Sequence, residues 1–313
     1  MSDLARQSVS PRLVVLAWVA VPIAWPAVAH AQVPTLDGHR YVPSSLVAWS
    51  FVDTEVSATS EAGVTDFVIQ PDFPQLTPLV SLPRQVDGRY ITAAQTTAAS
   101  LAIVDCFSLN IALSAAGILP RDGVSALVVG GNAFLGENVG AALRLVRSGP
   151  FQLTVRADFT ALEVESVIPA RVPSAIRVTG DVFGVRPTVA AALTLAPRLG
   201  LQGSVIVNWQ HYDVDLPDDV TSLAGALAAT LSLDPVPMTL LVGANVTHEY
   251  GLDISTATAE AVFGPDRTDW NVEGGLYFTM RSELDLGLLF RAEVAGGDNN
   301  DRFHGLFRLG YYF

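Results

Sequence analysis

The sequence predicts an all-β fold, a closed antiparallel transmembrane β-barrel of about twelve strands, within a range of roughly 10–14. Apolar and polar residues alternate in segments of about ten residues, which is typical of strands that face two environments. Half of the 313 residues are hydrophobic and the mean hydropathy is +0.38, yet the longest candidate span, residues 223–246, is interrupted by Pro235 and Pro237. A bilayer-spanning helix needs about 20 apolar residues without such breaks. The hydrophobicity therefore indicates strands that cross a membrane.

The last twelve residues, 302–313, show the alternation most clearly. One face carries Phe303, Gly305, Phe307, Leu309, Tyr311 and Phe313, and the other carries His304, Leu306, Arg308, Gly310 and Tyr312. This ending resembles the C-terminal signature of Gram-negative outer-membrane β-barrels of the generic transporter or porin-like type. The resemblance implies that Phe307, Leu309, Tyr311 and Phe313 are read by the barrel-assembly machinery.

The N-terminal segment predicts export. Two arginines precede an apolar run, residues 13–29, which closes with an A-x-A cleavage pattern at residues 29–31. We expect a secretory signal peptide over residues 1–31, cleavage after Ala31 and a mature chain that starts at Gln32. An N-terminal membrane helix is the alternative, which two prolines inside the run disfavour. Export and the C-terminal strand together predict the outer membrane of a Gram-negative bacterium as the location.

Connection lengths predict the order and direction of the strands. We expect residues 32–43 to be a periplasmic lead-in and residues 44–313 to form the barrel, with the first strand over 44–58. Bacterial barrels have short periplasmic turns and longer outer loops. The short connections are 105–106, 148–150, 197–198, 234–236 and 281–282, and the long ones are 59–87, 118–136, 166–185, 214–220, 251–267 and 297–301. Counting back from the C-terminus gives about twelve strands with every short turn on one side, as such barrels require.

Alternation assigns the two faces of individual strands. In residues 151–161 the odd positions are all apolar, whereas the even positions are Gln, Thr, Arg, Asp and Thr. A soluble β-sandwich also alternates, but its apolar face turns inward, whereas a barrel in lipid turns that face outward. The strand directions then predict two aromatic belts. The outer belt is Trp209, Tyr250, Trp270 and Phe303, and the periplasmic belt is Phe151, Phe278, Tyr311 and Phe313.

Eight charged residues fall on the faces predicted to line the lumen: Arg144, Arg156, Asp158, Glu273, Asp285, Arg291, Glu293 and Arg308. Neighbouring strands place Arg144 beside Arg156 and Asp158. In the same way, they place Arg308 beside Asp285, Arg291 and Glu293. One interpretation is a lattice of ion pairs that fills and stiffens the barrel, because paired charges are favoured over isolated ones in a confined site. The other is a pore constriction that selects solutes by charge. The sequence leaves both open.

The other residues predicted to face the lumen are small or weakly polar. They are Ala190, Ala192, Ala226, Ala228, Thr188, Thr194 and Thr230, together with Leu241, Leu289 and Leu306. A barrel of about twelve strands lined in this way leaves a narrow path if no loop blocks it. We expect that path to suit small, partly apolar solutes.

Other classes of function have less support. The net charge of −13 argues against nucleic-acid binding. Three outer-loop residues, Asp215, Asp218 and Asp219, could hold Ca²⁺ or Mg²⁺, but they complete no calcium-loop motif and a solvated acidic loop is the simpler interpretation. No nucleophile and base are spaced in a recognisable hydrolase pattern, so we expect neither an enzyme nor a cofactor.

Two hypotheses about function follow. The first is a monomeric outer-membrane channel for passive passage of small solutes, including small apolar or aromatic compounds. The alternative is a structural or adhesion barrel with a plugged lumen and ligand-binding outer loops. Whether residues 59–87 or 166–185 fill the lumen would discriminate between them. In both cases the expected partners are outer-membrane lipid, lipopolysaccharide and the assembly machinery.

Overall fold

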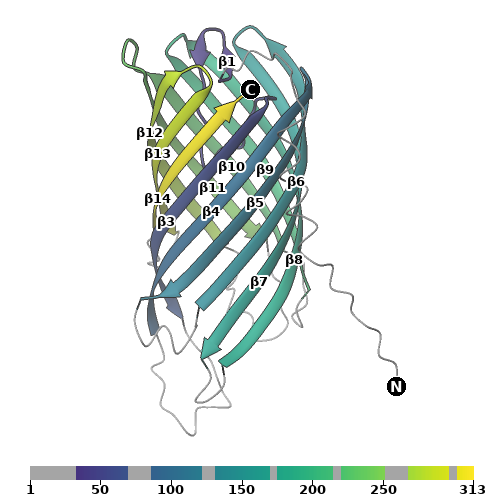
Figure 1. Cartoon of the computed structure of the whole chain (residues 1–313), viewed down its shortest axis with the longest axis vertical. Helices are drawn as coiled ribbons and strands as arrows, with labels where there is room; N and C mark the ends of the chain where they lie inside the picture. Colours follow the sequence, from purple (N-terminus) through teal and green to yellow (C-terminus); the bar gives the residue numbers. More distant parts are fainter. Residues whose placement is uncertain are drawn as a thin grey trace, which may run out of the picture. The chain divides into compact units, whose positions relative to one another are not determined.

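A computed structural model describes residues 33–69, 86–121, 131–169, 175–213, 220–250, 267–295 and 302–313. Twelve strands of this part of the chain, β3 to β14, close into one antiparallel barrel, and the hairpin β1–β2 precedes them (Figure 1). The hairpin strands are β1 (Thr35–Leu36) and β2 (His39–Arg40). The barrel strands are β3 (Glu55–Ile69), β4 (Val86–Val104), β5 (Phe107–Pro120), β6 (Gly131–Ser148), β7 (Phe151–Pro169), β8 (Ala175–Ala196), β9 (Leu199–Asp213), β10 (Val220–Ser232), β11 (Met238–Tyr250), β12 (Arg267–Arg281), β13 (Leu284–Ala295) and β14 (Arg302–Tyr312). The predicted fold class is confirmed.

The barrel closes because β14 pairs with β3, in a register that sets Phe307 opposite Ser60. Every other barrel strand pairs with its neighbours in the sequence. Because the described sheet closes on itself, it has no edge strand, as a sheet in lipid requires. Within the described residues, no helix is long and apolar enough to cross a bilayer.

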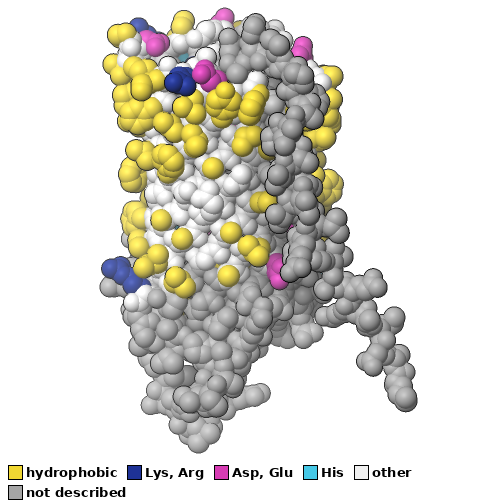
Figure 2. All heavy atoms as spheres, viewed as in Figure 1, with side chains coloured by type: hydrophobic (Ala, Val, Ile, Leu, Met, Phe, Trp, Pro, Cys, Tyr) yellow, Lys and Arg dark blue, Asp and Glu magenta, His cyan; other side chains and the backbone are white. Residues whose placement is uncertain are grey.

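The outward faces are apolar, as alternation predicts. On β11, Val242 is 65% exposed beside Leu241 at 1%, and on β13, Phe290 is 72% exposed beside Leu289 at 3%. Figure 2 shows hydrophobic side chains over the outer wall and charged side chains near its ends. Both aromatic belts, including Trp270 and Phe303 in the outer one, consist of exposed side chains. This surface matches the apolar band and aromatic girdles of a barrel embedded in a bilayer.

The first barrel strand differs from the prediction, because it covers Glu55–Ile69 rather than residues 44–58. Much of the two predicted outer loops, whose possible place in the lumen was left open, is also strand, since β3 and β4 extend into 59–87 and β7 and β8 extend into 166–185. The described parts of these loops therefore lengthen the wall instead of filling the lumen. The remaining outer-loop residues, 70–85, 122–130, 170–174, 214–219, 251–266 and 296–301, lie outside the described residues, as do Asp215, Asp218, Asp219 and the predicted signal peptide.

Residues 33–54, hereafter the plug, occupy the lumen instead. The plug combines the predicted periplasmic lead-in with most of the predicted first strand. Its residues include Val33, Leu36, Tyr41, Val42 and Phe51, which are almost completely buried although they belong to no barrel strand. The hairpin lies at the same end of the barrel as the C-terminus (Figure 1), and Phe313 N donates a hydrogen bond to Thr54 O. The plug therefore begins and ends at the end that carries the short turns, which is the predicted periplasmic side and is hereafter called the periplasmic end, mouth or rim.

The plugged lumen as the candidate functional site

The hairpin β1–β2 anchors the plug at the periplasmic mouth. Its turn, Asp37–Gly38, has positive φ angles of 47° and 81°, the left-handed backbone that glycine adopts without strain. Arg40 then donates hydrogen bonds to the carbonyl oxygens of Thr279, Arg281 and Leu284, at 3.0, 2.8 and 2.9 Å. One guanidinium thus joins the hairpin to the β12–β13 turn.

From the hairpin the chain enters the lumen along the inner faces of β9 and β12. Val42 O accepts a hydrogen bond from Gln202 at 2.9 Å, and Pro43 O accepts one from the Tyr277 hydroxyl at 2.5 Å. Further in, the buried Glu273 carboxylate accepts hydrogen bonds from the Ser44 hydroxyl and from the amide and hydroxyl of Ser45. Glu273 lies eight positions from Arg281 on β12, which corresponds to about 20 Å along the axis of a tilted barrel.

The chain then turns back toward the periplasm, so residues 46–54 form a return limb. Ser50 O accepts hydrogen bonds from Gln152 at 2.6 Å and Thr154 at 2.5 Å on β7. At the mouth, Ser100 Oγ donates to Asp53 O at 2.9 Å. Wall side chains therefore satisfy carbonyl groups of both limbs, which buried backbone without a sheet partner requires.

Aromatic contacts join the two limbs to each other. The rings of His39 and Tyr41 on the entering limb lie 4.7 Å apart, and Tyr41 contacts Phe51 of the return limb at 5.0 Å. Trp49 continues the series at 4.9 Å from Phe51. Gly200 on β9 makes room for this stack, because a Cβ there would lie 2.4 Å from the His39 ring and 2.8 Å from the Tyr41 ring.

Apolar packing fixes the plug against one side of the wall. Val42 packs with Leu241, Tyr277, Leu289 and Leu306 from β11 to β14. Elsewhere, Leu36 and Phe51 pack with Ala192 on β8, and Val47 packs with Ala226 and Ala228 on β10. All the small or weakly polar residues predicted to line the lumen are indeed buried inside it. Six of them pack against the plug and Thr194 and Thr230 form hydrogen bonds with it, so the open path that we expected along these residues is occupied.

Burial shifts the pKa values of several plug residues, among them His39 and Asp53. Burial lowers the pKa of His39, whose Nε2 lies 2.7 Å from Thr230 Oγ1. Burial, and secondarily the charge of Glu55, raise the pKa of Asp53 to about 7, although its carboxylate accepts a 2.8 Å hydrogen bond from the Trp49 indole. The closed plug therefore favours a neutral His39 and a protonated Asp53.

The eight predicted charged residues lie on inward faces, and most belong to ion-paired groups. On β7 and β8, Asp158 lies 3.8 Å from Arg156 and 3.5 Å from Arg186. Gly140 admits this carboxylate, since a Cβ at Gly140 would lie 2.1 Å from it. Arg144 is half-buried nearer the periplasmic rim, opposite Thr154 rather than beside Asp158.

The remaining charges gather near the β14–β3 closure. Arg308 forms an ion pair with Glu55. It also lies 3.9 Å from Asp285, in agreement with the predicted proximity of these two residues. Arg291 pairs instead with Glu61 at 2.5 Å, and Glu293 pairs with Arg302 at 3.1 Å, so neither is beside Arg308. His304 Nδ1 lies 2.7 Å from Glu61. This arrangement matches the ion-pair lattice, whereas Glu273 has a separate role as an acceptor for the plug.

The inner wall of β4 to β6 contrasts with the rest of the lumen. Ala94, Thr96, Ala98, Ala112, Ser114, Ala116, Gly136 and Asn138, hereafter the neutral strip, face inward and remain partly exposed. The return limb forms hydrogen bonds with this side near the periplasmic mouth, from Ser100 Oγ to Asp53 O and from Ala102 N to Thr54 Oγ1. The plug therefore fills the lumen asymmetrically.

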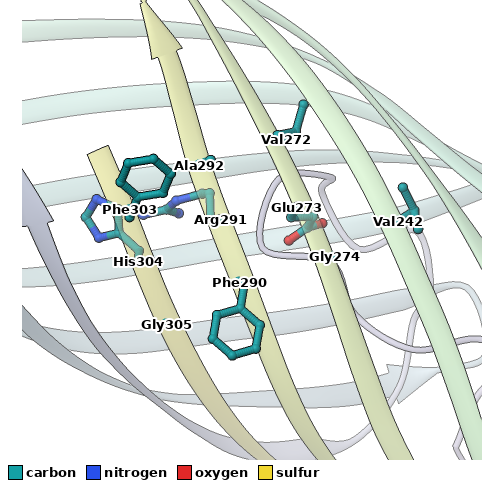
Figure 3. Close-up of a pocket in the computed structure, with 10 residues that line it drawn as sticks. All are labelled: Val242, Val272, Glu273, Gly274, Phe290, Arg291, Ala292, Phe303, His304 and Gly305. Carbon is teal, nitrogen blue, oxygen red and sulfur yellow. The ribbon is translucent and has the colours of Figure 1, made fainter. Parts of the chain in front are cut away.

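A depression of about 480 Å³ lies in the wall across β11 to β14 (Figure 3). Figure 3 shows that its lining residues come from neighbouring strands. Phe290 and Phe303, both exposed on the outer face, flank Gly305 in this depression. Its lining combines apolar residues of the predicted lipid-facing band with Glu273, Arg291 and His304, whose side chains lie on the inward face.

Sequence reasoning missed the plug and the residues that hold it, chiefly Arg40, Gln152, Gln202 and Tyr277. One signal for it exists in residues 46–49, where four apolar residues follow one another without alternation. A continuous apolar run indicates burial on every side, which a lipid-facing strand does not have.

Comparison with known proteins agrees with the architecture. No family model and no curated protein matches the sequence. Among solved structures, the COG4313 outer membrane channel from Pseudomonas putida F1 matches with a TM-score of 0.62 and 12% identity, covering 88% of this chain and 100% of that one. The translocator domain of the autotransporter NalP from Neisseria meningitidis matches with a TM-score of 0.53 and 11% identity, covering 83% and 88%. The transport unit of the autotransporter AIDA-I from Escherichia coli matches with a TM-score of 0.51 and 10% identity, covering 83% and 90%.

At these identities the likeness concerns the fold. The matched structures, the closed twelve-strand sheet and the apolar outer wall agree with one another. The chain is an outer-membrane-type β-barrel.

Proposed function

We propose that this protein is an outer-membrane channel for small solutes, and that residues 33–54 are a movable plug that closes its periplasmic half. The observation that carries the proposal is the way the plug is held. It forms no strand of the barrel, and much of its attachment consists of single hydrogen bonds from wall side chains to its carbonyl groups. Each such bond contributes about 1 kcal/mol net, because water replaces it when the plug leaves.

Withdrawal of the plug would leave the wall intact. The barrel closes through β14 and β3, and the plug joins the wall covalently only at Glu55, where β3 begins at the periplasmic rim. A barrel of about twelve strands is wide enough for a narrow aqueous path once its lumen is cleared. The segment can therefore leave toward the periplasm without breaking any strand pair.

The direction of the chain separates this proposal from polypeptide secretion. The plug enters at the periplasmic mouth and returns to it, so none of residues 33–54 crosses the lumen from end to end. The alternative of a structural or adhesion barrel with a permanently closed lumen remains a competing proposal, because the plug is well packed in the closed state.

Single-channel recordings of the refolded mature chain test the proposal. We expect brief current steps in the wild type and at least about tenfold more open time in Arg40→Ala, because this variant loses three hydrogen bonds to the β12–β13 turn. Arg147→Ala is the matched control, since Arg147 makes one exposed 3.2 Å bond to Thr35 O, and it should change open time by less than about twofold. Silent bilayers with both variants, when the protein is folded, would support the structural barrel instead.

A further inference from the structure

The neutral strip differs from the opposite wall in exposure but not in residue type. Ala98 and Ala112 of the strip are partly exposed, whereas Ala190 and Ala226 on the opposite wall are buried. All four alanines lie six positions or fewer from the periplasmic end of their strand. Thr96 and Thr188 form a similar pair, each eight positions from that end. Of the buried members, Ala226 packs against Val47 of the plug, whereas the strip members remain partly exposed.

The strip is also uncharged over its length. Among the inward-facing residues of β4 and β5 whose side chains are described, none is Asp, Glu, Lys or Arg. Two of its polar groups are paired with each other, since Thr96 Oγ1 lies 3.0 Å from Ser114 Oγ. Ion pairs flank it on both sides, with Asp158 and its arginines on β7 and β8, and Arg291 with Glu61 near the closure. The strip is therefore the part of the lumen where an uncharged molecule meets no competing ion.

Unpartnered polar groups lie at the periplasmic end of the strip. Ser108 Oγ on β5 has no hydrogen-bond partner although Ser108 is only 1% exposed, and Asn110 Nδ2 beside it on the same inward face is also unpartnered. Buried donors without acceptors are unfavourable and are normally satisfied. A solute that carries an oxygen acceptor would satisfy them as it passes.

The return limb covers this end. Ser100 Oγ donates to Asp53 O, and Ala102 N donates to Thr54 Oγ1, at 2.9 and 3.1 Å. By contrast, the entering limb is fixed to β8, β9 and β12 by Leu36, Val42 and Pro43. Displacing the return limb, residues 46–54, would open the periplasmic end of the strip, while the hydrogen bonds of the entering limb to β8, β9 and β12 remained in place.

We infer that solutes cross along the neutral strip, between the plug and β4 to β6, and that this path admits small uncharged molecules bearing a hydrogen-bond acceptor. The inference rests on the proposed channel function and specifies where and what that channel conducts. Charged solutes cross more slowly than uncharged ones of similar size, because they lose hydration against a wall without compensating charge. Arg144 lies nearer the periplasmic end of β6 than the strip residues Gly136 and Asn138.

Liposome swelling tests the inference with erythritol as the uncharged probe and erythronate as an anion of similar size. Erythritol should enter faster, and Ala112→Trp, which fills the strip, should reduce its entry by at least about tenfold. Ala115→Trp is the matched control, because Ala115 faces outward on the same strand, and it should leave entry unchanged. Electrophoretic heat-modifiability verifies that both variants are folded.

A smaller change tests the same path without a bulky residue. In a Cys106→Ser background, a cysteine at Ser114 should react with a small methanethiosulfonate added from outside and then block erythritol entry, whereas a cysteine at the buried Ala190 should be protected. Erythritol entry that survives both Ala112→Trp and modification at position 114 would overturn the inference and leave the channel intact. No entry of either probe, even with Arg40→Ala, would instead contradict the proposed function itself.

Discussion

The two halves of the inner wall use similar small residues for opposite purposes. On β8 and β10, Ala192 and Ala228 are buried under the plug, whereas on β4 and β5, Ala98 and Ala112 stay accessible. The difference lies in their neighbours. The plug side also presents Leu241, Leu289 and Leu306, which pack on Val42, and such apolar contacts stabilise a docked segment. A small-residue lining therefore identifies space in a lumen, but the larger residues beside it decide whether that space is filled.

The largest expected effect comes from filling the space that Gly200 leaves for the plug. In Gly200→Val, the added side chain clashes with His39 and Tyr41, and overpacking of about 3 kcal/mol would raise open time by on the order of 100-fold. The buried alanines should then become as accessible to thiol reagents, after substitution by cysteine, as those of the neutral strip. Gly225→Val is the control, because a Cβ at Gly225 has no neighbour within 4 Å, and it should leave open time unchanged. Equal open times for the two valine variants would show that the hairpin does not hold the plug.

A smaller effect is expected from the hydroxyl of Tyr277. Tyr277→Phe keeps the ring against Val42 but removes the 2.5 Å hydrogen bond to Pro43 O, which costs about 1–2 kcal/mol and should raise open time about tenfold. Single-channel recording measures this change. Tyr311→Phe, at an exposed position of the outer wall, provides the comparison and should behave as the wild type.

The smallest effect concerns pH and the return limb. Because the pKa of Asp53 is raised to about 7 in the closed state, its contribution to closure is full below the ordinary aspartate pKa of about 4 and is lost as pH rises toward 7. Asp53→Asn removes this loss, so open time at pH 7.5 should fall by about threefold or more relative to the wild type, with little change at pH 4.

His39 acts in the opposite direction and provides a check on that result. Since burial lowers the pKa of His39, protonation below about pH 6.5 favours release of the plug. This increase in open time at acid pH should persist in Asp53→Asn. An Asp53→Asn channel whose open time still rises between pH 5 and 7.5 as in the wild type would assign that dependence to another group.

Much of the barrel could be predicted from the sequence, because within each strand the alternation of apolar and polar residues indicates which face meets lipid and which meets the lumen. The twelve strands, their direction, the aromatic belts and the inward position of Arg308 or Asp158 all follow from alternation and connection length. The prediction of a strand over residues 44–58 was wrong. That segment is also apolar, and it was counted as the twelfth strand back from the C-terminus. Its true pairing involves hydrogen bonds to side chains more than 100 residues away, such as Gln152 to Ser50, which no local pattern encodes.

The candidate site was predictable only in its parts. Charge and parity placed Arg156 and Asp285 inside, but the partners of Arg291 and Glu293 depend on the stagger between strands, which alternation alone does not determine. The buried leucines at 241, 289 and 306 were visible as inward apolar residues. In a water-filled pore such residues are unfavourable, so they already indicated that something packs against them.

Covalent attachment of the plug to the wall is the most direct test of whether residues 33–54 gate the barrel. In a Cys106→Ser background, cysteines at Val47 and Ala226, which contact each other in the closed lumen, can be joined by a disulfide or a short thiol cross-linker. We expect the cross-linked channel to be silent in a planar bilayer. Reduction of the cross-link should restore the current steps of the uncross-linked parent. Equal current before and after reduction, with the cross-link verified, would contradict the claim that residues 33–54 gate this barrel.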